Sequence, residues 1–235
     1  MSGHYIGSEL ELFSIATNWK GYVARQFSRF VGGRVLDVGA GIGSNIPYLH
    51  TPSVTEWTAL EPDPVLAAVI AGRIDNGELP ASCRVLNGTV DTLAAAECFD
   101  TILYLDVIEH IEDDAAELRR AASHLAPHGR LVVLAPAHQF LFSPFDAVIG
   151  HHRRYTAQSL RGAGPPGCRV ELCRMLDSVG FFASLANRIM LRSEQPSPAQ
   201  IRFWDRILVP LSRLTDRTSG FTFGKSVAIV WAHEA

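Results

Sequence analysis

The chain has 235 residues, enough for one sizeable domain, and its 47% hydrophobic and 19% charged residues are typical of a globular protein with a full core. A formal net charge of −3, without a basic stripe interleaved with aromatic residues, excludes a typical nucleic-acid-binding protein. No apolar run reaches the ~18 residues of a membrane span, no secretory signal is visible and the four cysteines form no CxxC pair, so we expect a cytoplasmic protein with free thiols and no metal.

Apolar residues at spacings of three and four predict a helix over residues 12–31, which Gly32 and Gly33 end. Buried strands then alternate with helices. The predicted strands cover residues 34–39, 55–63, 82–88, 99–108 and 129–136, and the predicted helices cover 46–50, 64–74 and 113–125. Near-continuous apolar strands separated by helices indicate a parallel sheet that is covered on both faces.

The alternation of strands and helices ends at Pro136. A polar and aromatic segment leads to a short helix, and the remaining elements are predicted as strands at 167–176 and 225–233 and helices at 178–191 and 197–217. The last of these helices is amphipathic and interrupted at Pro210. No stretch has the composition of a linker, so we expect a single domain over residues 1–235.

Charge is distributed unevenly along the chain. Residues 1–150 carry a net charge of −9 and residues 151–235 a net charge of +6. A basic C-terminal third favours an anionic substrate or surface. The alternative is a solvated, arginine-rich face of the domain.

The stretch RVLDVGAGIGSN runs from a predicted strand into three glycines at alternate positions. Because glycine lets the backbone approach a ligand closely, and the next helix presents free N–H groups, such a turn binds the polar part of a nucleotide-like ligand. The dinucleotide pattern GxGxxG requires glycine where Ser44 stands. An acidic residue followed by three alternate glycines fits fully, at Asp37, Gly39, Gly41 and Gly43. Glu61 ends the second predicted strand, where a carboxylate accepts hydrogen bonds from ribose hydroxyls of either ligand.

The motifs between Val35 and Pro136 together resemble those of class I S-adenosylmethionine-dependent methyltransferases. The matching stretches, in the family's order and spacing, are VLDVGAGIG, LEPD, NGTVDTL, FDTILYLDVIEHIEDD and LAPHGRLVVLAP. The later stretch SPFDAVIGHHRRYT is similar to a subgroup of bacterial small-molecule methyltransferases. The resemblance implies an α/β fold with a Rossmann-like seven-stranded, mostly parallel sheet, helices on both faces and a C-terminal antiparallel hairpin. It divides the domain into an N-terminal helical segment (1–33), a cofactor-binding core (34–136) and an acceptor-site and C-terminal elaboration (137–235).

The resemblance also implies the cofactor, S-adenosyl-L-methionine, and the residues that hold it. Asp37, Gly39, Gly41 and Gly43 would surround its methionine end, Glu61 its ribose, Thr89 and Val90 its adenine, and Leu105 and Asp106 its ammonium group. Thr89 departs from the family pattern, because an aspartate often contacts the adenine amino group at that position.

Methyl transfer is an in-line displacement in which the acceptor attacks the methyl carbon and the thioether leaves, so alignment and exclusion of water do most of the work. A general base is needed where the acceptor must lose a proton. The candidates are His110, His151 and His152. The alternative for His110, which follows Glu109 after the fourth predicted strand, is a histidine that only shapes the pocket.

The cluster GHHRRYT follows the fifth predicted strand, on the ligand-binding edge of the sheet. Arg153 and Arg154 are candidates to bind a carboxylate or phosphate of the acceptor, and Tyr155 is a candidate to line the acceptor pocket. The alternative is a surface loop whose arginines pair with the acidic first part of the chain and whose Thr156 caps a helix.

An apolar stripe runs along residues 201–214 and includes Trp204, Ile207, Leu208, Leu211 and Leu214, with arginines between. A basic amphipathic helix with a tryptophan can rest on a membrane surface, and the acceptor would then be lipid-linked. We favour the other interpretation, in which the stripe packs on the core of its own domain or closes a lid.

The sequence therefore predicts methyl transfer from S-adenosylmethionine to a small-molecule acceptor, with O- or N-methylation favoured. The alternatives are an NAD(P)-dependent oxidoreductase and a non-catalytic S-adenosylmethionine-binding protein. Ser44 and the lack of a Tyr-x-x-x-Lys pair count against the oxidoreductase, and the intact turn from Asp37 to Gly43 counts against a non-catalytic protein. No sequence feature indicates an oligomeric state.

Overall fold

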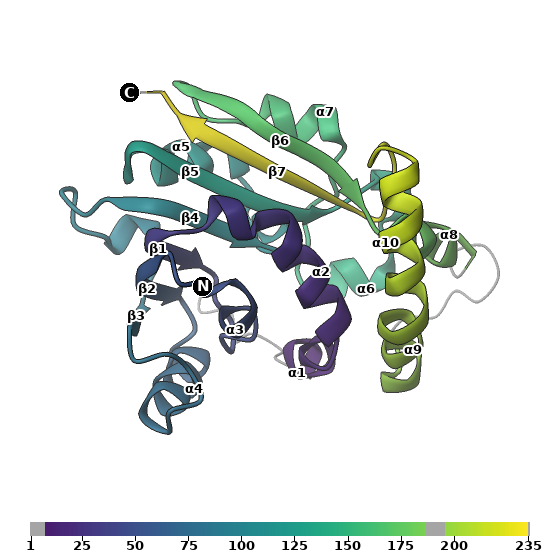
Figure 1. The fold of residues 1–235 in the computed structure, drawn as a ribbon, viewed down its shortest axis with the longest axis horizontal. Helices are drawn as coiled ribbons and strands as arrows, with labels where there is room; N and C mark the ends of the chain where they lie inside the picture. The colour runs from purple at the N-terminus through teal and green to yellow at the C-terminus, as the bar shows by residue number, and fades with distance from the viewer. Residues whose placement is uncertain (1–7, 187–195, 235) are drawn as a thin grey trace.

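The computed structural model describes residues 8–186 and 196–234, so the end of the helix predicted over 178–191 and the first residues of the N-terminal segment lie outside the described residues. Seven strands form one sheet in the order β3-β2-β1-β4-β5-β7-β6 (Figure 1). Their bounds are Gly33–Val38 (β1), Val54–Glu61 (β2), Cys83–Asn87 (β3), Phe99–Leu105 (β4), Leu125–Pro136 (β5), Cys168–Leu176 (β6) and Ser226–His233 (β7). The first five strands pair in parallel, and β7 is antiparallel to both β5 and β6. The predicted fold class is confirmed.

Helices cover both faces of this sheet. Their bounds are Ser8–Ser14 (α1), Thr17–Phe27 (α2), Ile46–Leu49 (α3), Pro64–Asp75 (α4), Asp114–Ala122 (α5), Pro144–Val148 (α6), Ala157–Gly162 (α7), Ser178–Ala186 (α8), Pro198–Phe203 (α9) and Val209–Thr218 (α10). Alternate residues of each strand point to opposite faces. Val35 accordingly belongs to a core shared with α2, α3, α4 and α10. Its neighbour Leu36 belongs to a core shared with α5 and α7.

The N-terminal helix is divided, although its apolar spacing predicts one continuous helix. Asp205, far away in the sequence, accepts a hydrogen bond of 2.8 Å from the backbone N–H of Trp19 and so binds the free N–H groups that begin α2. Lys20 Nζ donates to the carbonyl oxygens of Phe13 and Ser14 at 2.7 and 3.1 Å and so binds the free carbonyls that end α1. Both ends created by the break are therefore stabilised by side chains.

The C-terminal helical segment continues through Pro210, where the sequence predicted an interruption. Pro210 is the second residue of α10 and has no N–H to donate to the preceding turn. A π-helical turn, Trp204–Leu208, joins α9 to α10 and shifts the helical register. Ile207, Leu211 and Leu214 are 48, 50 and 65% exposed, whereas Trp204 packs against the core. Only part of the stripe therefore packs on the domain.

Most remaining helices surround the carboxyl ends of the strands. Residues of α1, α6, α8 and α9 contribute to one large cavity there. The helix α6, which the sequence did not predict, begins at a capping box between Ser143 and Asp146. Among the described residues, no helix is long and apolar enough to cross a membrane.

Candidate active site

The glycine turn after β1 requires backbone conformations that other residues rarely adopt. Gly39 and Gly41 have φ angles of +65° and +60°. A Cβ at position 39 would lie 2.8 Å from Cγ1 of Val107, so the turn packs directly on the segment that follows β4. This close approach joins the ends of two neighbouring strands, where ligands bind in open parallel sheets.

The loss of stability in Gly39→Ala is therefore expected to exceed the penalty for placing alanine in a left-handed backbone conformation. Gly77 is a matched control, because its φ angle is +73° and a Cβ there would meet nothing within 4 Å. We expect Gly77→Ala to cost about 1–2 kcal/mol, from the left-handed backbone alone. Gly39→Ala adds the contact with Val107, so its urea unfolding midpoint should be the lower of the two. Equal midpoints would show that the side chain of Val107 moves aside at no cost in stability.

Glu61 links the end of β2 to the glycine turn. Its Oε2 accepts a hydrogen bond of 2.7 Å from the N–H of Gly41, and its Oε1 accepts one of 3.0 Å from the N–H of Asp63. Burial raises the pKa of this carboxyl, against the effect of these two hydrogen bonds. Each oxygen keeps a further lone pair, so the carboxylate can also accept hydrogen bonds from a ligand.

A cavity of about 1520 Å³ extends from this turn across the carboxyl ends of the strands. Its described lining includes eight of the predicted site residues: Gly39, Gly41, Glu61, Leu105, Asp106, His110, His151 and Arg154. Seven others lie outside the lining: Asp37, Gly43, Thr89, Val90, His152, Arg153 and Tyr155. The structure thus brings together the turn, the end of β4 and one part of the GHHRRYT segment.

Two predicted acidic residues experience different surroundings. Asp37 is 3% exposed within β1, where burial raises the pKa of its carboxyl to about 7. Asp106 lines the cavity with an unusual φ of +57°. Enclosure by the cavity walls raises its pKa to about 6, although His151 and Lys225 oppose this rise.

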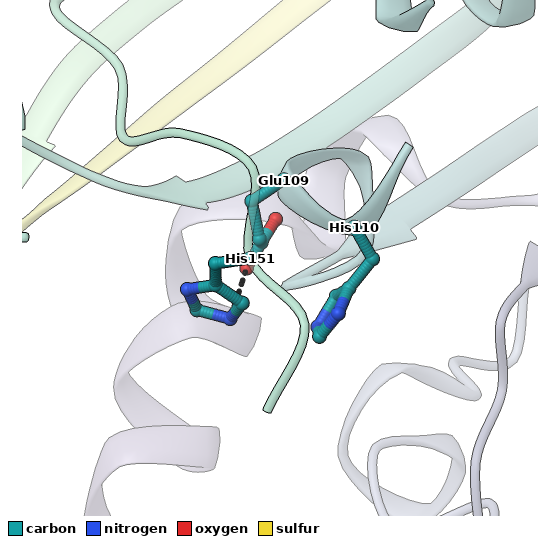
Figure 2. A group of neighbouring side chains, drawn as sticks. All are labelled: Glu109, His110 and His151. Carbon is teal, nitrogen blue, oxygen red and sulfur yellow. Dashed lines mark ion pairs between the residues drawn. The ribbon is translucent and has the colours of Figure 1, made fainter. Parts of the chain in front are cut away.

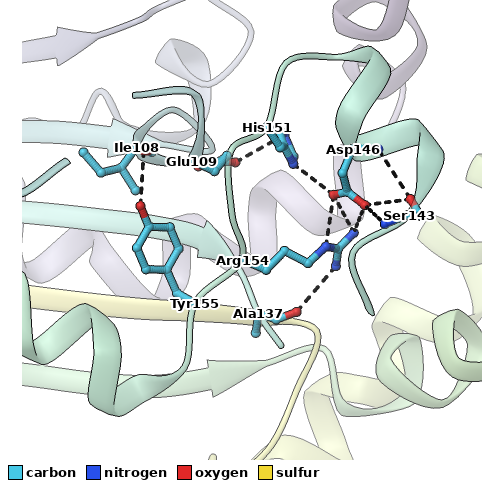
Figure 3. Close-up of polar contacts among 8 residues, drawn as sticks. All are labelled: Ile108, Glu109, Ala137, Ser143, Asp146, His151, Arg154 and Tyr155. Atoms are coloured by element: carbon cyan, nitrogen blue, oxygen red, sulfur yellow. Dashed lines mark hydrogen bonds and ion pairs between the residues drawn. The ribbon is translucent and has the colours of Figure 1, made fainter. Parts of the chain in front are cut away.

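His151 is held by a network that the sequence did not reveal (Figure 3). Its Nδ1 lies 2.9 Å from Oδ1 of Asp146. The guanidinium of Arg154 donates hydrogen bonds to the same carboxylate from Nε and Nη2, at 3.0 and 2.9 Å. The hydroxyl of Ser143 donates a further hydrogen bond to this carboxylate at 2.6 Å. Arg154 therefore orients Asp146, and Asp146 orients the imidazole.

Glu109 and His110 belong to a short 3₁₀ turn, Ile108–His110, and lie beside His151 (Figure 2). Glu109 is fully buried, with its Oε1 3.8 Å from Nε2 of His151, and burial raises its pKa well above the usual value. Burial and the neighbouring His151 lower the pKa of His110 to about 4. The rings of His110 and His151 meet edge to face with centroids 4.6 Å apart.

The other residues of GHHRRYT hold the segment in place. Arg153 Nη1 lies 3.1 Å from Oδ2 of Asp114, and the Tyr155 hydroxyl donates to the same oxygen at 2.7 Å. Thr156 begins α7 with a capping box, as one of the two interpretations of this segment predicted. His152 is exposed and donates its backbone N–H to the carbonyl of Glu109 at 2.8 Å.

Sequence reasoning missed several cavity residues. Lys20 and Lys225 both line the cavity, and burial lowers the pKa of each, that of Lys20 to about 8. Lys225 Nζ lies 4.7 Å from the centre of the Trp204 ring. Aromatic side chains from four helical segments complete the walls: Phe13, Trp19, Phe145 and Trp204. The signal in the sequence was weak, because these residues are far apart and each fits an ordinary helix face.

The site combines a glycine turn after β1, an acidic residue at the end of β2 and a cavity at the carboxyl ends of the strands. Together with the strand order, these features define a class of protein, the class I S-adenosylmethionine-dependent methyltransferases. The chain belongs to the family described as "Methyltransferase domain", whose sequence profile matches residues 15–180, more than half of its length.

The chain is similar to two proteins named ubiquinone biosynthesis O-methyltransferase. The protein from Azorhizobium caulinodans is 32% identical over 117 residues, which cover 48% of this chain and 44% of that protein. The protein from Rhodopseudomonas palustris is 32% identical over 110 residues, which cover 47% and 42%. These matches thus span less than half of the relatives' own length.

Solved structures share the fold at lower sequence identity. A putative sarcosine dimethylglycine methyltransferase from Galdieria sulphuraria aligns with a TM-score of 0.62 and 17% identity, covering 93% of this chain and 85% of that one. Coclaurine N-methyltransferase bound to N-methylheliamine and SAH aligns with a TM-score of 0.62 and 14% identity, covering 90% and 71%. The [4+2]-cyclase SpnF also aligns, with a TM-score of 0.60 and 17% identity, covering 93% and 81%. The fold alone therefore does not determine the reaction.

Proposed function

We propose that this protein transfers the methyl group of S-adenosylmethionine to an oxygen atom of a small-molecule acceptor. The observation that supports the proposal is that one cavity runs from the glycine turn and Glu61 to the cluster of Glu109, His110 and His151. A cofactor whose ribose is held at Glu61 would direct its sulfonium toward that cluster. The acceptor would occupy the part of the cavity beyond it.

The walls of the cavity favour an acceptor with a flat, apolar body. Phe13 and Trp19 each pack against Trp204, with ring centroids 6.5 and 5.6 Å apart. Aromatic walls stack favourably on a flat ring. The ammonium groups of Lys20 and Lys225 favour an anionic substituent on the same molecule. The name of the two relatives, O-methyltransferase, is the reason to prefer oxygen over nitrogen as the acceptor atom.

Calorimetric titration of the protein with S-adenosylmethionine, S-adenosylhomocysteine and NAD tests the proposal. We expect micromolar affinity for the first two, about −8 kcal/mol, and no heat with NAD. Transfer of a radiolabelled methyl group to phenolic acceptors would follow. Binding of NAD alone would overturn the proposal. Cofactor binding without transfer to any oxygen, nitrogen or carbon acceptor would indicate a non-catalytic binding protein.

A further inference from the structure

Glu109, His110 and His151 come from two separate segments and meet at one point of the cavity wall (Figure 2). One carboxylate oxygen and one nitrogen from each imidazole all lie within 4.8 Å of one another. Nothing in the class of fold requires two imidazoles and a carboxylate at this point, since the sulfonium reacts without them. The cluster therefore needs its own explanation.

The carboxylate of Glu109 has unusual surroundings. It is 0% exposed, and neither of its oxygens has a hydrogen-bond partner among the residues that the structure describes. Nε2 of His151 lies 3.8 Å from Oε1, which is too long for a hydrogen bond. Burying a carboxyl group without a partner costs free energy, so such a group is typical of a place where a ligand supplies the missing interaction.

His151 has the orientation that a metal ligand needs. With the proton on Nδ1, the imidazole donates to Oδ1 of Asp146 at 2.9 Å, and Nε2 keeps its lone pair toward Glu109 (Figure 3). Histidines that bind metals almost always donate their second N–H to a carboxylate, carbonyl or water in this way. Arg154 and Ser143 fix the carboxylate in turn, so the direction of the imidazole is built into the fold.

We propose that Glu109, His110 and His151 bind a divalent transition-metal ion of the Zn²⁺ type. Two imidazoles and one carboxylate are a ligand set of catalytic zinc sites that leave a coordination position open. Bonds of about 2.0–2.2 Å place ligand atoms about 3.5 Å apart, so the side chains would close by roughly 1 Å around the ion. This proposal replaces the sequence-based expectation of no metal, because the third ligand joins the first two only in the folded chain.

The role of the ion rests on the proposed function. The open position would bind the hydroxyl oxygen of the acceptor and lower the pKa of that hydroxyl, whose proton passes to solvent water. A lone pair of the oxygen then forms the bond to the methyl carbon, and the carbon–sulfur bond breaks with its electron pair remaining on sulfur. The products are the methyl ether, S-adenosylhomocysteine and one proton.

Metal binding is tested on the whole protein after chelation and dialysis, with Zn²⁺ alone as the titrant in a calorimeter. We expect one Zn²⁺ per chain, and at least 100-fold weaker binding by Glu109→Gln, which keeps the size of the side chain. Co²⁺ should give the absorption bands of a bound ion in the unmodified protein and not in Glu109→Gln. His152→Gln is the matched control, since His152 is the neighbouring histidine and lies outside the cavity lining.

The outcomes separate this inference from the proposed function. Absence of Zn²⁺ binding, or unchanged affinity in Glu109→Gln, would overturn the metal site and make His151 with Asp146 the general base. If the chelated protein still binds S-adenosylmethionine in that case, the proposed function stands without the metal. If neither ligand binds, both are overturned. Loss of Zn²⁺ binding in His152→Gln as well would assign the metal to a different site and also overturn the inference.

Discussion

Glu61→Ala is expected to weaken S-adenosylmethionine binding at least tenfold, a loss of more than ~1.4 kcal/mol. The carboxylate accepts the N–H groups of Gly41 and Asp63, so it fixes the turn on one side and the start of α4 on the other. A ribose with two hydroxyls would bind the remaining lone pairs. The substitution removes both contributions, whereas Glu61→Gln keeps the shape but replaces one acceptor oxygen by a donor. We expect the glutamine variant to bind with intermediate affinity in the same calorimetric titration.

Glu56→Ala provides the control, because Glu56 lies on the same strand at its opposite end. Its side chain is 35% exposed and pairs with Arg34 and Arg84, far from the cavity lining. We expect unchanged cofactor affinity in this variant and a cooperative thermal transition in all three. If Glu61→Ala retains the affinity of the unmodified protein, the assignment of Glu61 to the ribose is wrong.

Most of the sheet could be predicted from the sequence because its central strands are apolar and are bounded by glycine or a helix cap. Asp63 and Asp113, for example, begin α4 and α5 by accepting backbone hydrogen bonds from the first turns. Such signals are local, so they survive in one sequence without an alignment. The strand β5 is longer than predicted because Leu125 pairs with Phe99 ahead of the apolar run.

The break between α1 and α2 and the shift at Trp204–Leu208 could not be predicted. Apolar periodicity over 12–31 fits one helix equally well, and the contacts of Asp205 and Lys20 at the break favour two. Asp205 itself lies in the π-helical turn, which no propensity indicates. The break between α1 and α2 thus involves a residue of the π-helical turn, and this tertiary contact overrides local preference.

The candidate site, like the fold, could be predicted from the sequence only in part. The turn and Glu61 follow directly from strands that the sequence marks, so their positions at one edge of the sheet were predictable. The network around Asp146 was not predictable, since Ser143, His151 and Arg154 meet its carboxylate only in the folded chain. Arg154 is a candidate to bind the acceptor, and in the structure it pairs with Asp146 and lines the cavity.

Asp146→Ala is expected to destabilise the protein by about 3–5 kcal/mol, because it leaves the guanidinium of Arg154 buried without its partner. The side chains of Arg154 and Asp146 are 11 and 1% exposed, so little water replaces the lost carboxylate. The pair of Arg120 and Asp91 is the matched control, with side chains 41 and 62% exposed. Asp91→Ala should cost less than about 1 kcal/mol in urea unfolding at neutral pH. Equal losses in the two variants would contradict the importance of burial.

Lowering the pH should reduce the difference in unfolding free energy between the unmodified protein and Asp146→Ala. Burial alone would raise the pKa of Asp146, but the hydrogen bonds from His151 and Arg154 outweigh it and hold the pKa well below the usual 3.8. A carboxyl whose pKa is depressed by folding contributes fully above the pKa of the unfolded chain, and the contribution falls as the pH drops toward the folded value. The loss of unfolding free energy in Asp146→Ala should therefore be largest near about pH 7 and smaller near about pH 3. A loss that is constant across this range would show that Asp146 acts through the shape of its capping box and not through its charge.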